Sequence, residues 1–283
     1  MRTAAIIFRM LNRLNPTSYG RFRVIAAAQK LGCIPEDGVY TIEHGIKMEF
    51  SFGDFIEQAI YFDAFEYMIR RTLMKRFRRS LAFLDIGANI GYYSILASKL
   101  MPSGGVIYSV EANPKTLRAL RKNIELNSIS NVNILPFAAY DNEGAVDILM
   151  PIDGTHGSAS LRNQGWGEIC QFRVPSRRLD RQLSNVKVLD LIKIDIEGAE
   201  MQALKGAEAL LKAHKPTVIV EIVPSFLKKF GTEPRNVFEF LLDMNPKYRV
   251  WEIKEHSLEL CIGSKMRSPE YQPRGNFLFA AEA

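Results

Sequence analysis

Residues 81–91, Leu-Ala-Phe-Leu-Asp-Ile-Gly-Ala-Asn-Ile-Gly, constrain the fold of this chain more than any other stretch. The apolar run 81–84 is typical of a parallel strand that is buried on both faces, and Asp85 closes it. Gly87 and Gly91 bracket a tight turn, and residues 92–100 follow with a helical pattern. A strand, a glycine turn and a helix in this order predict a site for a nucleotide-like ligand, because backbone without a Cβ approaches a ligand closely.

The dinucleotide fingerprint G-x-G-x-x-G does not fit this turn. Counted from Gly87, its other glycines would fall at Asn89 and Tyr92. Asp85 stands two residues before Gly87 instead, which resembles the first motif of class I S-adenosylmethionine-dependent methyltransferases. A carboxylate suits that cofactor, which has a cationic sulfonium and an ammonium but no pyrophosphate. The alternative is an ordinary strand-to-helix turn with a chance aspartate.

Composition predicts a folded α/β protein. The 283 residues suffice for one large domain with additions or for two small domains. Apolar residues make up 47% and charged residues 24%, which disfavours disorder. Three cysteines without metal-ligand spacing, Cys33, Cys170 and Cys261, indicate reduced thiols and a cytoplasmic setting. No apolar run reaches the length of a membrane span.

The net charge of +6 is uneven, since residues 1–80 hold 13 Lys and Arg against 8 Asp and Glu. Residues 1–32 predict one or two short helices, in which five apolar residues fall at helical spacing between arginines: Ile6, Ile7, Met10, Leu11 and Leu14. One interpretation is a basic amphipathic helix on an anionic membrane, which would place the protein at the inner membrane surface. We favour the other, a helix that packs its apolar stripe on the main domain.

A hairpin and a helix are expected to follow. Residues 39–43 and 47–52 alternate around His44-Gly45, which predicts a β-hairpin. Asp54 is a candidate cap for a helix that runs to about residue 77. Its basic residues are expected to form a solvated helix face and end: Arg70, Arg71, Lys75, Arg76, Arg78 and Arg79. They lack interleaved aromatic residues, so nucleic acid is not an expected partner.

A second strand is predicted at 106–110, ending at Glu111, and the pair Asn113-Pro114 starts a helix that runs to about residue 126. Glu111 lies 24 residues after Gly87. An acidic residue at this point can accept hydrogen bonds from both ribose hydroxyls of a nucleoside. This supports a nucleoside ligand without choosing between adenosylmethionine and NAD; the alternative is a solvated strand-end carboxylate.

The next part of the chain predicts strands at 132–135 and 145–150 and a long loop at 151–169. The loop is rich in Gly, Ser and Asn and contains His156. A loop of this length inside a domain is often functional, as a lid or a substrate loop.

The strand predicted at 189–196 carries charge where a buried strand should be apolar. Lys193, Asp195 and Glu197 alternate with isoleucines, so the three share one face at the carboxyl end of the strand. Open α/β sheets bind ligands at that end. The alternative is an internal Lys193–Asp195 pair that neutralises itself. A helix at 199–213, a strand at 218–221 that ends in Glu221, a helix at 234–244 and strands at 248–253 and 276–280 complete the pattern.

Two stretches give the resemblance its specificity: Asp-Ile-Gly-Ala-Asn-Ile-Gly-Tyr-Tyr-Ser at 85–94, and Lys-Ile-Asp-Ile-Glu-Gly-Ala-Glu at 193–200 with Leu-Lys-Gly at 204–206. Together they resemble the FkbM family of methyltransferases over about residues 60–223. The resemblance implies the class I methyltransferase fold, α/β with a seven-stranded, mostly parallel, Rossmann-like sheet. With it we expect an N-terminal helical and hairpin extension at 1–78 and a methyltransferase domain at 79–283.

The resemblance also implies the reaction and the residues of the site. The expected reaction moves a methyl group from S-adenosylmethionine to a hydroxyl of a sugar, of a glycolipid or polysaccharide precursor, or of a secondary metabolite. Its expected cofactor contacts are Asp85 and Gly87 at the methionine end with Ala88, Asn89 and Gly91 in the same turn, Glu111 at the ribose with Ala112 and Asn113 beside it, and the backbone of Ala138 and Ala139 at the adenine.

A free hydroxyl is a weak nucleophile, so a positioned base is expected. Asp195 is the first candidate, followed by Glu197, Glu221 and His156; no metal site is predicted. Two other functions stay open, a nicotinamide-dependent oxidoreductase and a non-catalytic module that binds a nucleoside. The basic N-terminal segment hints at a lipid-linked glycan or another anionic acceptor, and the sequence leaves the oligomeric state open.

Overall fold

One mixed sheet organises the molecule in the computed structural model, which describes residues 2–15, 17–152, 159–163, 167–255, 257–261, 271 and 273–281. Within those residues the sheet has eight strands in the order β12-β11-β13-β10-β9-β3-β4-β5. Their bounds, in that order, are Leu258–Leu260, Arg249–Ile253, Gly275–Ala280, Thr217–Ile222, Leu191–Ile194, Ala82–Ile86, Val106–Val110 and Val132–Leu135. The strands from β10 to β5 pair in parallel, and β13, β11 and β12 pair antiparallel at the other edge.

This sheet confirms the predicted class. The seven predicted strands are present, and the short β12 adds an eighth at the edge. The strand order reverses between β3 and β9, since the chain runs from β3 to β4 and β5 on one side and then returns to place β9 on the other side of β3. Such a switch point opens a crevice at the carboxyl ends of the strands.

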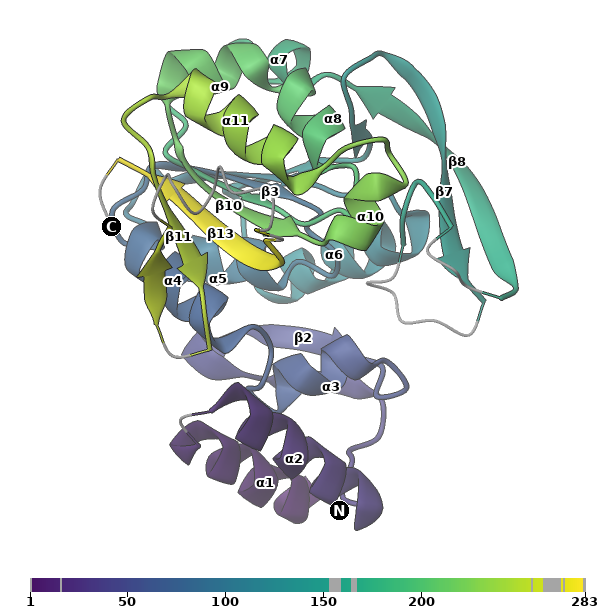
Figure 1. The fold of residues 1–283 in the computed structure, drawn as a ribbon. Helices are drawn as coiled ribbons and strands as arrows, with labels where there is room; N and C mark the ends of the chain where they lie inside the picture. The colour runs from purple at the N-terminus through teal and green to yellow at the C-terminus, as the bar shows by residue number, and fades with distance from the viewer. Residues whose placement is uncertain are drawn as a thin grey trace.

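Helices cover both faces of the sheet (Figure 1). One face carries α7 (Leu179–Gln182), α8 (Glu200–Gly206), α9 (Glu208–His214) and α11 (Pro234–Met244), and the other carries α4 (Tyr67–Phe77), α5 (Tyr92–Leu100) and α6 (Pro114–Leu126). Alternate residues of each strand serve the two faces: Phe83 belongs to the core on the α5 side and Leu84 to the core on the α11 side. The continuous apolar runs of the sequence follow from this double cover.

Local pattern predicted α5, α6 and α11 to the residue, but two predicted helices are broken. The helix expected from Asp54 to residue 77 is α3 (Phe55–Tyr61) followed by α4. Asp54 caps α3 as predicted, accepting from the backbone N–H groups of Ile56 and Glu57. Left-handed backbone at Asp63 and Glu66 then ends one helix and starts the next. The helix expected at 199–213 is likewise α8 and α9, parted at Ala207.

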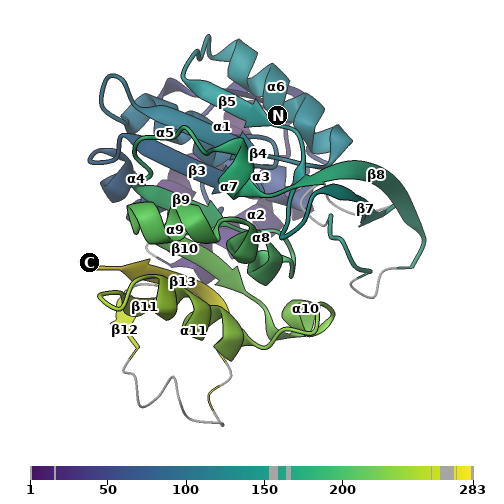
Figure 2. The ribbon, with the colours of Figure 1, turned by 90° about the horizontal axis from the view of Figure 1, so that it is seen from above.

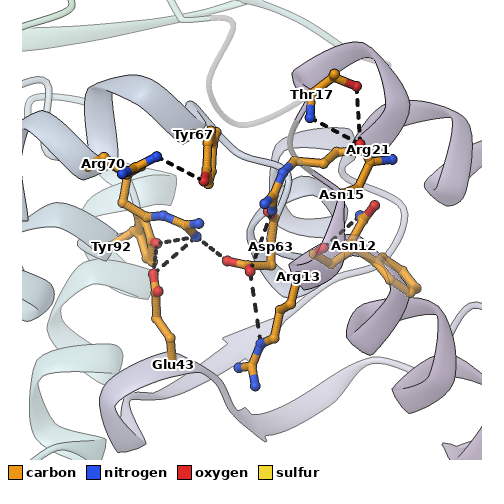
Figure 3. A network of polar contacts seen from close by, with 12 residues as sticks. Asn12, Arg13, Asn15, Thr17, Arg21, Glu43, Asp63, Tyr67, Arg70 and Tyr92 are labelled. Carbon is orange, nitrogen blue, oxygen red and sulfur yellow. Dashed lines mark hydrogen bonds and ion pairs between the residues drawn. The ribbon is translucent and has the colours of Figure 1, made fainter. Parts of the chain in front are cut away.

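The break between α3 and α4 explains why one expectation for the basic cluster is wrong. Arg70 is not solvated: only 5% of it is exposed, and it pairs with Asp63 and with Glu43 (Figure 3). The turn at 62–66 brings Asp63 opposite the first turn of α4, and that contact could not be seen from helical spacing. Arg71, Lys75, Arg78 and Arg79 are exposed, as expected, and Arg76 is half-buried; these five form no part of the buried pair.

The N-terminal part consists of α1 (Arg2–Leu14), α2 (Ser18–Lys30) and the hairpin β1 (Gly38–Thr41) to β2 (Lys47–Phe50), with a 3-10 turn η1 (Glu43–Gly45) between the strands. The two helices and the hairpin are as predicted. This part lies below α4 and α5 in Figure 1, at the far end of the molecule from α9. Its buried residues, such as Met48 and Phe50, belong to the same core cluster as Tyr92 and Ile95 of α5, so this part and the sheet share a core.

Helix α1 does not pack as we expected. Its apolar stripe faces away from the molecule: Ile6, Ile7, Met10, Leu11 and Leu14 are 47–82% exposed. The buried residues of α1 are Ala5 and Asn12, and the Asn12 side-chain amide donates to the carbonyl of Phe62 at 2.8 Å. The favoured interpretation, in which the stripe packs on the main domain, is therefore wrong.

A small second sheet stands beside the main one, formed by β6 (Ala138–Ala139), β8 (Ile169–Arg177) and β7 (Gly144–Pro151). The long ribbon of β7 and β8 extends on the right of Figure 1 and is seen again in Figure 2. Sequence reasoning missed β6, β12 and α10 (Pro224–Lys228), which are too short to show a period.

Candidate functional site

A cavity of about 270 Å³ opens where β3, β4, β9 and β10 end. This is close to the lower bound of about 300 Å³ that is usual for small-molecule sites. Its lining residues divide into the glycine turn after β3, an apolar end with one carboxylate beside β4, and an acidic end beside β9 and β10. The cavity therefore lies in the crevice that the strand order creates.

The glycine turn is held by close backbone packing. Gly87 has φ +85°, and a Cβ there would lie 2.0 Å from the carbonyl oxygen of Asp195. The N–H groups of Gly87 and Ala88 both donate to the carbonyl of Val110 at 3.0 Å, which ties the turn to β4. Gly87, Ala88 and Asn89 line the cavity. Gly91 is not among the lining residues; a Cβ on it would meet Leu120 of α6 at 2.5 Å.

Glu111 is fixed at the apolar end by backbone donors. Its two oxygens accept from the N–H groups of Asn89 and Asn113, each at 2.8 Å. Only 9% of the residue is exposed, which does not fit the solvated carboxylate of the alternative reading. Burial raises the pKa of Glu111, while the backbone hydrogen bonds act in the opposite direction. Asn113 also caps α6, since its side chain accepts from the N–H of Lys115.

Small and apolar residues surround this carboxylate. Ala112 and Asn113 line the cavity with Glu111, and Ala138 and Ala139 line it with Phe137 and Ile148. Eight of the ten expected cofactor contacts therefore meet in one cavity. This end is suited to a nucleoside, because apolar residues that can border a flat ring lie beside a carboxylate that can accept hydrogen bonds from hydroxyls.

Asp85 lies beneath the cavity and is not among its lining residues. It is 1% exposed, and its Oδ2 accepts from the Ser94 hydroxyl at 2.6 Å, which in turn accepts from Ser109. Its Oδ1 has no hydrogen-bond partner within the described residues. Burial raises the pKa of Asp85, and the charge of Lys193 opposes that rise.

The acidic end brings together four carboxylates from three parts of the chain, namely the turn after β9, β10 and the start of α4. Asp195, Glu197 and Glu221 line the cavity, as the sequence predicts for strand-end side chains, and Glu66 at the start of α4 joins them. The Lys193 ammonium donates to Asp195 at 2.9 Å and lies 5.2 Å from the centre of the Tyr93 ring. The pair that the alternative reading expected therefore exists, but Asp195 opens onto the cavity rather than into the core.

The carboxyl groups at the acidic end of the cavity lie close enough to shift one another's pKa values. The negative charge of Asp195, together with burial, raises the pKa of Glu221. Burial and the charge of Asp195 raise the pKa of Glu197 to about 8. Burial by itself would lower the pKa of Lys193, but the surrounding carboxylates outweigh it and raise that pKa. Part of this cluster is therefore protonated at neutral pH, so it offers hydrogen-bond donors as well as acceptors.

A tight turn after β9 places two of these carboxylates. Glu197 has φ +57° and Gly198 has φ +110°, and a Cβ on Gly198 would meet the carbonyl of Phe226 at 2.8 Å. Glu200 closes the turn by accepting from the N–H groups of Gly198 at 3.0 Å and Ile196 at 3.3 Å. The stretch at 193–200 thus consists of the end of a strand, a tight turn, and Glu200, whose side chain stabilises that turn.

Sequence reasoning missed Glu66, whose side chain accepts from the Tyr93 hydroxyl at 2.7 Å. It lay in the middle of an expected helix, and no local signal marked it. The expected loop at 151–169 does reach the site, since Ala159, Ser160 and Leu161 line the cavity. His156, the fourth candidate base, lies outside the described residues. Within them, no group of three or more His, Cys, Asp or Glu side chains is placed to hold a metal ion.

Comparisons with known proteins place the site in a family context. The family model described as "Methyltransferase FkbM domain" matches residues 85–248. The chain is 25% identical over 165 residues to "Methyltransferase 1" of Beauveria bassiana, covering 50% of this chain and 64% of that protein. It is 38% identical over 142 residues to a probable cobalt-precorrin-6B C(15)-methyltransferase (decarboxylating) of Sulfolobus acidocaldarius, covering 50% and 66%.

Two solved structures are also similar. One is the methyltransferase FkbM of Methylobacillus flagellatus, with TM-score 0.48 and 18% identity, covering 80% of this chain and 55% of that one. The other is an O-methyltransferase of Bacillus cereus in complex with SAH, with TM-score 0.41 and 16% identity, covering 94% and 90%. The chain spans less than two thirds of the length of both curated relatives.

Proposed function

This chain belongs to the FkbM methyltransferase family, and on that premise we propose that it transfers the methyl group of S-adenosylmethionine to a hydroxyl oxygen of an acceptor. One observation carries the proposal: a single cavity holds a backbone-fixed carboxylate at an apolar end and Asp195 at an acidic end, with the glycine turn between them. The acceptor class we favour is a polyhydroxylated molecule, such as a sugar or a glycan precursor.

The residues present fit the cofactor. The Oδ1 atom of Asn89, buried at the cavity wall, has no hydrogen-bond partner in the described part of the chain, so a ligand donor would satisfy it. Glu111 would accept from the ribose hydroxyls, and the apolar wall at Ala138 and Ala139 would border the adenine. Bound there, the cofactor would supply an electrophilic methyl group on a cationic sulfur.

Asp195 is placed to act as the base. Lys193 binds its Oδ2, which fixes the orientation of the carboxylate and leaves Oδ1 for an acceptor hydroxyl. Asp195 would accept the proton of the acceptor hydroxyl as that oxygen takes up the methyl group that the bound cofactor would supply. By holding the acceptor hydroxyl in a fixed orientation, the cavity would supply much of the rate.

Glu66, Glu197 and Glu221 surround the acceptor position on this proposal. Because burial and mutual repulsion favour their protonated forms, they can donate to as well as accept from neighbouring hydroxyls. A cluster of carboxyl groups of this kind suits an acceptor that carries several hydroxyl groups.

Titration calorimetry of the purified protein with S-adenosylmethionine, with NADH as the control, tests the cofactor. We expect binding of the first alone; binding of NADH would favour an oxidoreductase instead and contradict the proposal.

The Asp195→Asn variant tests the base. We expect it to bind S-adenosylmethionine as the wild type does but to lose turnover by about 10²–10⁴-fold, as is usual when a general base is removed. The assay follows transfer of labelled methyl to a panel of hydroxylated acceptors. A fully active Asp195→Asn enzyme would place the base elsewhere.

A further inference from the structure

Exposed apolar side chains gather in the N-terminal part of the molecule. Of the fourteen large hydrophobic residues that are exposed in the described part of the chain, ten lie in the first 55 residues. Five form the stripe of α1 described above: Ile6, Ile7, Met10, Leu11 and Leu14. Tyr19 and Phe22 of α2 and Leu31 just after it are exposed as well. An exposed apolar stripe such as that of α1 on a folded domain marks an interaction site.

Helix α1 is held with this stripe outward by polar contacts on its opposite side. Arg9 donates to the carbonyl of Thr41 at 2.9 Å and lies over the Tyr61 ring, and Asn12 donates to the carbonyl of Phe62. Arg13 pairs with Asp63 at 3.9 Å (Figure 3). The inner side of α1 therefore combines these polar contacts with Ala5 and the partly buried Phe8, while the larger apolar stripe faces outward.

The contacts that anchor α2 make this arrangement firm. Arg21 is buried and donates to the backbone carbonyl of Asp63, whose carboxylate also lies 3.6 Å from the Arg21 guanidinium. α1 packs along α2, and both lie at the end of the molecule that is farthest from α9 (Figure 1). The exposed stripe is therefore a fixed surface and not the result of a loosely attached helix.

The charge of this segment points to the occupant of the surface. Residues 1–35 contain six Lys and Arg and no Asp or Glu, whereas residues 36–283 contain 31 of each kind. The whole net charge of the chain thus sits in the segment that carries the apolar stripe. Arg23 and Lys30 of α2 are exposed there. A second copy of the chain would bring like charges together across a twofold axis, which opposes association.

We propose that α1 and α2 dock the protein on an anionic lipid bilayer, with the apolar stripe of α1 entering the headgroup boundary and the exposed basic residues facing the lipid charges. α1 has 13 residues and is about 20 Å long, so it lies along the surface. In the described residues no helix is long and apolar enough to cross a membrane. This docking does not depend on the reaction proposed above.

The test is co-sedimentation of the full chain with vesicles of phosphatidylcholine alone or mixed with phosphatidylglycerol. We expect the protein to pellet with the mixed vesicles and not with the neutral ones. Raising the salt from about 0.1 M to 1 M shortens the Debye length from about 10 Å to 3 Å and should weaken binding. Absence of binding to the mixed vesicles would overturn the proposal.

Two variants separate the apolar and the charge contributions. Ile7→Ser with Met10→Ser should weaken vesicle binding about tenfold or more, because these side chains supply the inserted surface. Arg23→Gln with Lys30→Gln should do so by a similar factor. The matched controls change exposed residues elsewhere, Leu81→Ser with Val188→Ser and Arg118→Gln with Arg121→Gln, and should bind as the wild type does.

All the substituted residues are exposed, so thermal unfolding should be unchanged, and this is measured for each variant. Equal loss in a variant and its control would overturn the proposal. So would a concentration-dependent dimer in light scattering that Ile7→Ser with Met10→Ser abolishes, because the stripe would then be an interface between copies.

Discussion

Single side chains in this site owe their properties to neighbours that are distant in the chain. Glu111 is the clearest case, because two backbone N–H groups from different loops fix its carboxylate. Glu197 is another, since its pKa depends on burial and on Asp195. Predictions at this scale concern what happens when one such group is removed.

The Glu111→Ala variant should bind S-adenosylmethionine about 10–100-fold more weakly, because hydrogen bonds to a charged group contribute about 1.5–3 kcal/mol. The fold should persist, since Asn113 still caps α6. Calorimetry gives the affinity and circular dichroism checks the fold. Unchanged affinity in a folded variant would remove Glu111 from the cofactor site.

Titration of the Glu197 carboxyl group should make the folded protein less stable as the pH rises. Its pKa is about 8 in the folded protein, against about 4.3 in an unfolded chain. The folded state holds the proton more tightly, so the contribution to the free energy of unfolding is full below about pH 4.3 and is lost as the pH rises through about 8. Between about pH 5 and 8, the free energy of unfolding of Glu197→Gln should therefore fall by about 1–3 kcal/mol less than that of the wild type.

Denaturant unfolding at a series of pH values measures this difference. The control is Glu239→Gln, because Glu239 forms an exposed pair with Arg235 within α11 and should change the profile little. Parallel pH profiles for the wild type and Glu197→Gln would contradict the assignment.

Elements of this fold meet through backbone contacts that admit no side chain. The turn after β3 touches the chain after β9 at Gly87, where a Cβ would lie 2.0 Å from the carbonyl of Asp195. α8 touches Tyr140 in the same way through Gly206. The glycine turn therefore does two things, since it exposes backbone to the cavity and lets two strand ends approach.

The Gly87→Ala variant should destabilise the protein by more than about 2 kcal/mol and weaken ligand binding, because it adds a clash to a left-handed backbone. Gly104→Ala is the matched control. Gly104 has the same φ of +85°, but nothing lies within 4 Å of its Cβ position. Only the backbone strain, about 1–2 kcal/mol, should appear there. Equal losses in the two variants would mean that the contact with Asp195 does not matter.

The parts of the fold that sequence reasoning found are those with a local cause. α6 begins at a capping Asn followed by Pro, and the parallel strands are apolar runs, so both could be read from neighbouring residues. Glu66, Arg70 and the outward stripe of α1 could not, because each depends on a partner from another element. The motif at 193–200 was found because charge in a buried strand is costly without a use.

At the scale of the whole molecule, one buried ionic network joins the extension to the sheet. Asp63 binds Arg21 from α2 and Arg70 from α4, and Arg70 also binds Glu43 of the hairpin and Tyr92 of α5 (Figure 3). The two arginines are buried, and Asp63 is the carboxylate that they share. The network makes the orientation of α1 and α2 a property of the fold as a whole.

The Asp63→Asn variant should lower the free energy of unfolding by about 3–5 kcal/mol, because it leaves the buried Arg21 guanidinium without its counter-charge and Arg70 with Glu43 alone. Asp147→Asn is the control, since Asp147 pairs with Arg173 on the surface of the β7–β8 ribbon. That change should cost less than about 1 kcal/mol. Thermal unfolding measures both, and a similar small effect of Asp63→Asn would mean that the network adds little to stability.

The position of Glu66 has a consequence for how such an enzyme diversifies. The end of the cavity assigned to the cofactor is built from the glycine turn, Glu111 and the wall that includes Ala138, Ala139 and Ile148, whereas the acidic end takes Glu66 from the start of α4. Mutation in the segment before β3 can therefore alter the acidic end of the cavity while the glycine turn and Glu111 stay as they are. Descendants of one ancestor could in this way inherit the same chemistry and acquire different substrates. Exchanging this segment between homologous proteins is then a direct way to change substrate selectivity.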